Sequence, residues 1–277
     1  MSTPETTQRP SAGRPLGRAT VVGLTMLGVL IACLLLPSYV FTALVVVGII
    51  VGLWEIRRVL LGAGYSIPTV AIVGAAVILP ACAYQYGVEG LVLALLCLVP
   101  VVLAWRLLQG GDNAVRDALA SVLIVTWIPF LASFLVVLVQ SDNGPAKVLT
   151  AVLITSASDT GGYLVGVLIG RHPMAPAVSP KKSWEGFAGS IVLGLIFAFI
   201  CFIYLLHAPW WVALVAGILG ACTATVGDLG ESLIKRDLQI KDMGQILPGH
   251  GGLLDRVDSL LATAPLIWLI ITVFLGS

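Results

Sequence analysis

Charged residues are scarce in this chain of 277 residues, since Asp, Glu, Lys and Arg together make up only 10% of it. Hydrophobic residues account for 58%, and the mean hydropathy is +1.04. A composition this apolar excludes an ordinary soluble domain and indicates a membrane protein. The formal net charge of +1 says nothing about partners, because the distribution of the charges carries that information. We expect no nucleic acid to bind.

Paired cysteine motifs are also lacking. The five cysteines stand singly inside apolar runs, without the CxxC spacing of a metal or redox site. Such residues are typical of small side chains that pack against neighbouring helices or lipid. We therefore expect neither a disulfide framework nor a zinc site from Cys33, Cys82, Cys97, Cys201 and Cys222.

Long apolar runs are abundant instead. Runs of about 18 or more residues with few charges are typical of transmembrane helices. The sequence thus predicts an all-α integral membrane protein, a polytopic bundle of about nine transmembrane helices. The first run lacks a small-residue cleavage site, so we expect a helix there and not a cleaved signal peptide. The predicted spans are 19–36, 39–54, 67–84, 88–105, 119–139, 148–169, 187–206, 210–226 and 260–275.

The basic residues predict the orientation of these spans. With nine spans, all of the 15 Lys and Arg residues except Lys147 lie in alternate connections or in the N-terminal segment. Because positively charged connections stay in the cytoplasm, the N-terminus is predicted to be cytoplasmic and the C-terminus to lie outside. Residues 1–18 are rich in Thr, Pro, Ser and Arg without an apolar period, which predicts a disordered cytoplasmic tail.

One polar stretch, residues 227–258, interrupts the apolar background on the predicted cytoplasmic side. If span 210–226 continues as a helix, then Asp228, Glu231, Ser232 and Lys235 share one face of it. A solvated helical face is the common meaning of such spacing. Here, however, the acidic residues directly follow a membrane span. Further along, a glycine-rich turn at 248–252 allows a ligand to approach the backbone closely.

The same stretch also carries carboxylates that suit a metal. Asp255 and Asp258 lie one helical turn apart if the last helix has begun. Hard oxygen donors without a His or Cys cluster favour Mg²⁺, which commonly uses one or two carboxylates together with substrate phosphates.

Two upstream motifs point the same way. Asp159 lies inside span 148–169, where a carboxylate costs about 2.5–3.5 kcal/mol, so it is expected to be functional, or to cap a broken helix. Lys181 and Lys182 stand between serines just before span 187–206, where they suit a phosphate group. The alternative is an ordinary basic loop with Trp184 as an interface anchor. Together the motifs favour phosphoryl or nucleotidyl transfer onto a lipid.

The run from Ser232 to Asp258 resembles the signature of phosphatidate cytidylyltransferases (CDP-diacylglycerol synthases). It reads SLIKR, then KD, LPGHGG and DRVD, and the segments 159–163 and 179–186 are similar to upstream elements of that family. The resemblance implies a nucleotidyltransferase of phospholipid biosynthesis that converts CTP and phosphatidic acid to CDP-diacylglycerol and pyrophosphate. It also implies Mg²⁺, a monovalent cation such as K⁺, a homodimer, and a multi-pass protein of the cell membrane with its active site facing the cytoplasm.

Under this resemblance, residues 19–277 form a single transmembrane catalytic domain in which acidic residues hold the metal and basic residues hold phosphates. For the metal we expect Asp228 and Asp255 first, with Asp159 and Asp258 as further ligands. The expected catalytic residues are Asp228, Asp255, Lys235 and Arg236. The expected substrate-binding residues are Lys181, Lys182, Ser183, Ser232, Lys241, His250, Gly251, Gly252 and Arg256.

Two other functions fit parts of the sequence. The same residues would serve a kinase or nucleotidyltransferase acting on another lipid, such as a polyprenol or an ether-linked phosphatidate. A transporter would use Asp159 and Asp228 to bind a coupling ion, although the sequence shows no inverted repeat. The aspartate spacing of CDP-alcohol phosphotransferases, D-x2-D-G-x2-A-R, is absent.

Overall fold

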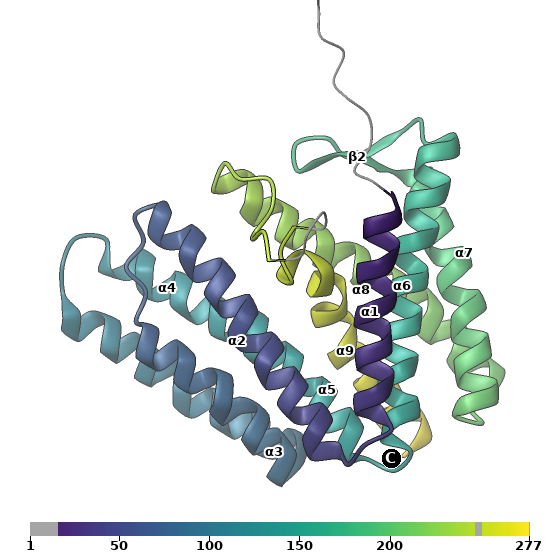
Figure 1. Cartoon of the computed structure of the whole chain (residues 1–277), viewed down its shortest axis with the longest axis horizontal. Helices are drawn as coiled ribbons and strands as arrows, with labels where there is room; N and C mark the ends of the chain where they lie inside the picture. The colour runs from purple at the N-terminus through teal and green to yellow at the C-terminus, as the bar shows by residue number, and fades with distance from the viewer. Residues whose placement is uncertain (1–15, 247–250, 277) are drawn as a thin grey trace, which may run out of the picture.

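The computed structural model describes residues 16–246 and 251–276, with side chains from residue 22 onward (Figure 1). The predicted N-terminal tail therefore lies almost entirely outside the described residues. Within them the chain forms helices and one short β-hairpin. The elements are α1 Leu16–Leu34, α2 Ser38–Gly62, α3 Thr69–Gln109, α4 Ala114–Val125, η1 Thr126–Phe130, α5 Leu131–Gln140, α6 Gly144–Ile169, β1 Pro173–Ala175, β2 Ser179–Ser183, α7 Trp184–Ile200, η2 Cys201–Leu205, α8 Trp210–Asp237 and α9 Leu254–Leu275.

The prediction of an all-α polytopic membrane protein is confirmed as a class. Among the described residues, seven helices are long and apolar enough to cross a membrane: α2, α3, the continuous helix 114–140, α6, the continuous helix 184–205, α8 and α9. A shorter apolar helix, Val22–Leu34, lies within α1. Large apolar side chains such as Leu93, Leu168 and Val226 are well exposed, as a lipid-facing surface requires.

Helix α3 is two helices in one. Gly87 has a non-helical backbone, with φ of 62° and ψ of −150°, between the predicted spans 67–84 and 88–105. A straight helix of 41 residues would extend about 60 Å. Yet Asp117 accepts hydrogen bonds from the Ser66 backbone N–H at 3.1 Å and from Arg106 at 2.7 Å. The two ends of α3 therefore meet at one carboxylate, and the chain folds back at Gly87.

The start of α1 and the end of α9 lie at opposite ends of the bundle. Helix α1 begins at the end that carries the β-hairpin, and α9 finishes at the other end (Figure 1). This arrangement is compatible with an odd number of crossings. The count of nine spans, and which end faces the cytoplasm, stay predictions.

Small residues bring α6 and α7 into close contact beside the hairpin. A Cβ added at Gly189 would lie 2.6 Å from the backbone oxygen of Gly161, so the two backbones nearly touch. The β-hairpin follows α6 directly, with Pro173 paired to Ser183 and Ala175 to Ser179. The sequence did not predict these strands, because they are only three and five residues long and both contain proline. The hairpin fixes the position of the paired lysines.

Candidate active site

The polar stretch after residue 226 begins inside a helix. α8 continues to Asp237, well beyond the predicted end of its span, so the signature residues are held rigidly. The prediction that they share a face is confirmed. Ser232 donates a hydrogen bond to Asp228 at 3.3 Å, and Lys235 donates to Glu231 at 2.7 Å, each pair one turn apart.

An ion pair joins this helix to the β-hairpin. The Lys182 ammonium lies 2.7 Å from the Asp228 carboxylate and also donates to the Thr225 backbone oxygen at 3.3 Å. The Lys182 side chain is 22% exposed and that of Asp228 is 37% exposed, so substrate can reach both groups. Two motifs that are 46 positions apart in the sequence are therefore parts of one site.

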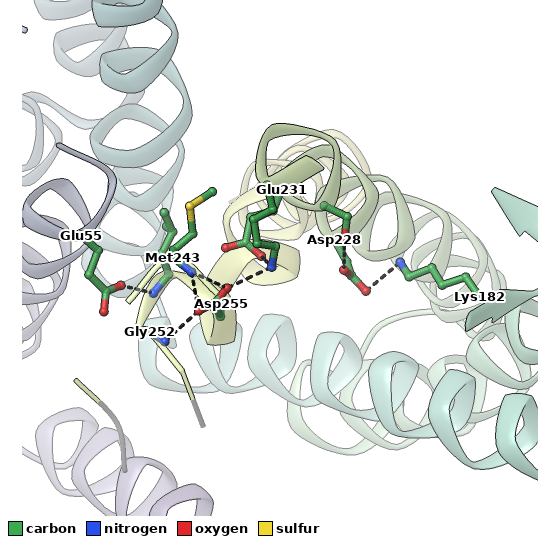
Figure 2. A network of polar contacts seen from close by, with 10 residues as sticks. Glu55, Lys182, Asp228, Glu231, Met243, Gly252 and Asp255 are labelled. Carbon is green, nitrogen blue, oxygen red and sulfur yellow. Dashed lines mark hydrogen bonds and ion pairs between the residues drawn. The ribbon is translucent and has the colours of Figure 1, made fainter. Parts of the chain in front are cut away.

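A second, more buried cluster lies further along α8 (Figure 2). Lys235 lies 2.7 Å from Glu231 and 2.9 Å from Asp255, and both carboxylates are almost fully buried. Asp255 also accepts hydrogen bonds from the backbone N–H groups of Met243, at 3.0 and 3.2 Å, and of Gly252, at 2.7 Å. Both oxygens of Asp255 thus accept hydrogen bonds, and these bonds hold the backbone of the connection between α8 and α9 at Met243 and at Gly252.

The remaining two predicted metal ligands lie near Asp228. Ser259 donates to Asp159 at 3.2 Å, which places the start of α9 against the middle of α6. Asp258 is 7% exposed, and its charge and that of Asp228 both act on Asp159. Asp159, Asp228 and Asp258 are therefore neighbours.

The four aspartates do not form one ready-made metal site. Across residues 16–246 and 251–276, no group of three or more His, Cys, Asp or Glu side chains is arranged to hold a metal ion. The physical reason lies in their partners: Asp228 turns toward Lys182, whereas Asp255 turns toward Lys235 and the backbone. A metal at this site would need further ligands, from water or from a substrate.

A cavity of about 560 Å³ opens between α6, the β-hairpin, α7 and α8. Its lining includes charged residues, apolar residues and glycines. Its charged lining residues are Asp159, Arg171, Lys181, Lys182 and Asp228, and its apolar ones include Tyr163, Val167 and Phe187. A molecule with a phosphate head and an apolar tail matches this mixed lining.

The other predicted site residues occupy different places. Ser183 lines the cavity and caps α7, accepting a hydrogen bond from the Gly186 N–H at 3.1 Å. Arg236 donates to the Val178 backbone oxygen at 3.1 Å and so supports the hairpin. Lys241 and Arg256 are exposed, and neither is among the described residues that line the cavity. Gly251 and Gly252 lie beside Asp255. His250 lies outside the described residues.

Sequence reasoning missed Glu55. It is the single acidic residue of α2, only 1% exposed, and it accepts hydrogen bonds from the backbone N–H groups of Leu253 and Leu254. No motif marks it. The available signal was the cost of a carboxylate inside an apolar run, which applies to Glu55 as it does to Asp159.

Known proteins resemble this chain over nearly its full length. A sequence model of the cytidylyltransferase family matches residues 18–274. A Mycobacterium bovis protein named phosphatidate cytidylyltransferase is 40% identical over 96% of this chain and 91% of its own length. Proteins of the same name from Mycobacterium tuberculosis and Mycobacterium leprae are 40% and 38% identical over 96% of this chain, and over 85% and 91% of their own lengths. The family prediction is confirmed: this nucleotidyltransferase belongs to the cytidylyltransferase family.

Proposed function

We propose that this enzyme transfers the cytidylyl group of CTP to phosphatidic acid, giving CDP-diacylglycerol and pyrophosphate for phospholipid biosynthesis. The names of its relatives support this substrate pair. The observation that carries the proposal is the cavity beside the Lys182–Asp228 ion pair, because its lining combines basic side chains with apolar ones. Membership of the cytidylyltransferase family also favours an enzyme over the transporter considered above.

The lining of the cavity suits both substrates. Lys181, Lys182 and Arg171 supply positive charge for the triphosphate and for the lipid phosphate. Tyr163 and Val167 are 70% and 68% exposed on a helix that is long and apolar enough to cross the membrane, so a lipid tail beside them would remain among acyl chains. A water-soluble phosphate acceptor would have no use for these exposed apolar side chains.

The proposed chemistry requires positioning more than it requires a base. A phosphate oxygen of phosphatidic acid forms a bond to the α-phosphorus of CTP, while the bond from that phosphorus to the bridging oxygen breaks and pyrophosphate leaves. The attacking phosphate monoester has its second pKa near about 6, so it is largely ionised at neutral pH. Bringing two polyanions together in line is the difficulty, and charge neutralisation and orientation supply the rate.

In this proposal Lys182 changes partners during substrate binding. Without substrate its ammonium is held by Asp228. An incoming phosphate would share the ammonium, and Asp228 would then be released toward a cation. Lys235 keeps two buried carboxylates as partners, so its first contribution is to hold Asp255 and Glu231 in place. Arg236 supports the hairpin that presents Lys181 and Lys182.

The donor set fits Mg²⁺ on condition that substrate completes its coordination. Asp159 and Asp228 line one cavity with Asp258 close by, and Mg²⁺ characteristically takes one or two carboxylates plus phosphate oxygens. When bound, the ion would supply charge neutralisation at the transferred phosphoryl group. Asp255 stays a proposed ligand, although its oxygens are engaged by Lys235 and backbone N–H groups.

Two wider features belong to the same proposal. The cavity is lined by Arg171, Lys181 and Lys182, so we expect the active site to face the cytoplasm from the cell membrane. The homodimer implied by the family resemblance stays a prediction.

The proposal is tested by incubating the purified full chain with CTP labelled in its α-phosphate and with phosphatidic acid in mixed micelles. We expect a lipid-extractable labelled nucleotide that requires Mg²⁺ and does not form when ATP replaces CTP. Polyprenyl phosphate and ether-linked phosphatidate serve as competing acceptors in parallel reactions. Label on a different lipid, with none on phosphatidic acid, would refute the proposed substrate.

A further inference from the structure

Helix α2 reaches the signature segment through one buried carboxylate. The Oε1 atom of Glu55 accepts the Leu253 N–H at 3.0 Å, and Oε2 accepts the Leu254 N–H at 2.9 Å. These are the residue preceding α9 and the first residue of α9. The contact joins positions 198 and 199 apart in the sequence (Figure 2). Glu55 therefore holds the beginning of the helix that carries Asp255 and Asp258.

The same carboxylate also lies against two glycines of the connection between α8 and α9. A Cβ added at Gly244 would lie 2.6 Å from the Glu55 Cδ atom, and one added at Gly252 would lie 2.6 Å from its Oε2 atom. Both positions are glycine because the carboxylate fills the space that a side chain would need. Glu55 thus contacts the connection between α8 and α9 at Gly244 and again at Gly252, just before α9.

Asp255 holds this segment from the opposite side. It accepts N–H groups of Met243 and Gly252 and pairs with Lys235. A shift of the first turn of α9 would move the Asp255 carboxylate away from Lys235. The position of Asp255 against α8 therefore depends on the two hydrogen bonds that Glu55 makes.

Holding a backbone with a buried carboxylate carries a large free-energy cost. Its desolvation is costly, and a neutral glutamine has the same length. Two N–H groups at the positive end of α9 converge on the carboxylate, and charge-assisted hydrogen bonds of this kind are stronger than neutral ones. An apolar side chain could not accept these hydrogen bonds, so the carboxylate places the start of α9 where an apolar residue would not.

We propose that Glu55 is a positioning residue for cytidylyl transfer, which sets the first turn of α9 and thereby the place of Asp255 beside Lys235. This inference rests on the proposed function of the same site. It assigns a role to the N-terminal half of the chain, in which no sequence motif was found.

The first test is Glu55→Gln. The NH₂ group of the glutamine would face either the Leu253 or the Leu254 N–H, and two donors cannot form a hydrogen bond. One of the two hydrogen bonds is therefore lost. A misplacement of this kind is expected to lower kcat roughly tenfold and leave the KM for CTP within about twofold. Hydrogen–deuterium exchange at the Leu253 and Leu254 amides should accelerate. Glu89→Gln, which removes an exposed carboxylate of α3, should change neither quantity.

A second test approaches the same contact from the loop. Gly244→Ala places a methyl group against the Glu55 carboxylate and should lower kcat by a similar factor. In a Glu55→Ala background the methyl group has room, so Gly244→Ala should cause a much smaller further loss. Losses of kcat that do not add show that Gly244→Ala acts through Glu55. Losses that add would show that the two substitutions act independently.

The proposal is overturned if folded Glu55→Gln enzyme keeps its kcat, or if its loss of activity only follows a loss of folded protein with exchange at α9 unchanged. Failure of the proposed function looks different, because the wild-type chain would then make no CDP-diacylglycerol. The exchange measurement does not depend on activity, and it tests the Glu55 contact in either case.

Discussion

Asp228→Asn is expected to lower the kcat of cytidylyl transfer by roughly a hundredfold to a thousandfold, the loss typical of removing one group that stabilises transition-state charge. Asparagine keeps the size of the side chain but removes the negative charge that faces Lys182 at 2.7 Å. It would also remove a carboxylate that the cavity offers to Mg²⁺. Initial rates of CDP-diacylglycerol formation, measured over a range of Mg²⁺ concentrations, check this expectation.

Stability should hardly change in this variant. The Asp228 side chain is 37% exposed, and partly exposed ion pairs contribute about 1 kcal/mol or less. Asp237→Asn is the matched control, because Asp237 is an exposed aspartate at the end of the same helix and does not line the cavity. Full activity of Asp228→Asn, or an equal loss in the control, would remove Asp228 from the site.

Asp255→Asn is expected to reduce both activity and stability. The oxygens of Asp255 accept hydrogen bonds from the Lys235 ammonium and from two backbone N–H groups. The NH₂ group of an asparagine would face one of these donors and could not accept its hydrogen bond. Leaving buried polar groups unsatisfied costs about 1–3 kcal/mol. We expect the thermal midpoint in detergent to fall and kcat to drop at least about a hundredfold, because the start of α9 and Lys235 are both displaced.

The contrast between the two aspartates is the informative result. A stable but inactive Asp255→Asn enzyme would contradict the hydrogen-bonded role and favour direct contact with metal or substrate. A destabilised enzyme with normal turnover per folded molecule would show that Asp255 is only structural. The expected pattern is loss of activity alone at Asp228 and loss of both properties at Asp255.

Much of the fold was predictable from local patterns. The apolar runs predicted the helices, and the interruption between 84 and 88 coincides with the fold-back at Gly87. The continuation of α8 to Asp237 agrees with the one-face spacing of Asp228, Glu231 and Lys235. The hairpin was not predictable, because short strands with prolines carry no alternating pattern.

Contacts within one helix of the site were predictable, but the arrangement of its elements was not. Residue spacing predicts neighbours within one helix, as for Lys235 and Glu231, and not distances between elements. The pairing of Lys182 with Asp228 arises only when the hairpin meets α8. The contact of Glu55 with α9 joins residues 198 positions apart, so no local pattern marks it.

The most direct test of the central claim is a structure of the full chain with Mg²⁺ and a CTP analogue that cannot be cleaved between its α- and β-phosphates. The account predicts the triphosphate in the cavity between α6, the β-hairpin and α8, with Lys182 on a phosphate and Asp228 turned toward the ion. A nucleotide bound elsewhere, for example in the separate groove lined by Ile56, Leu60 and Leu233, would contradict it.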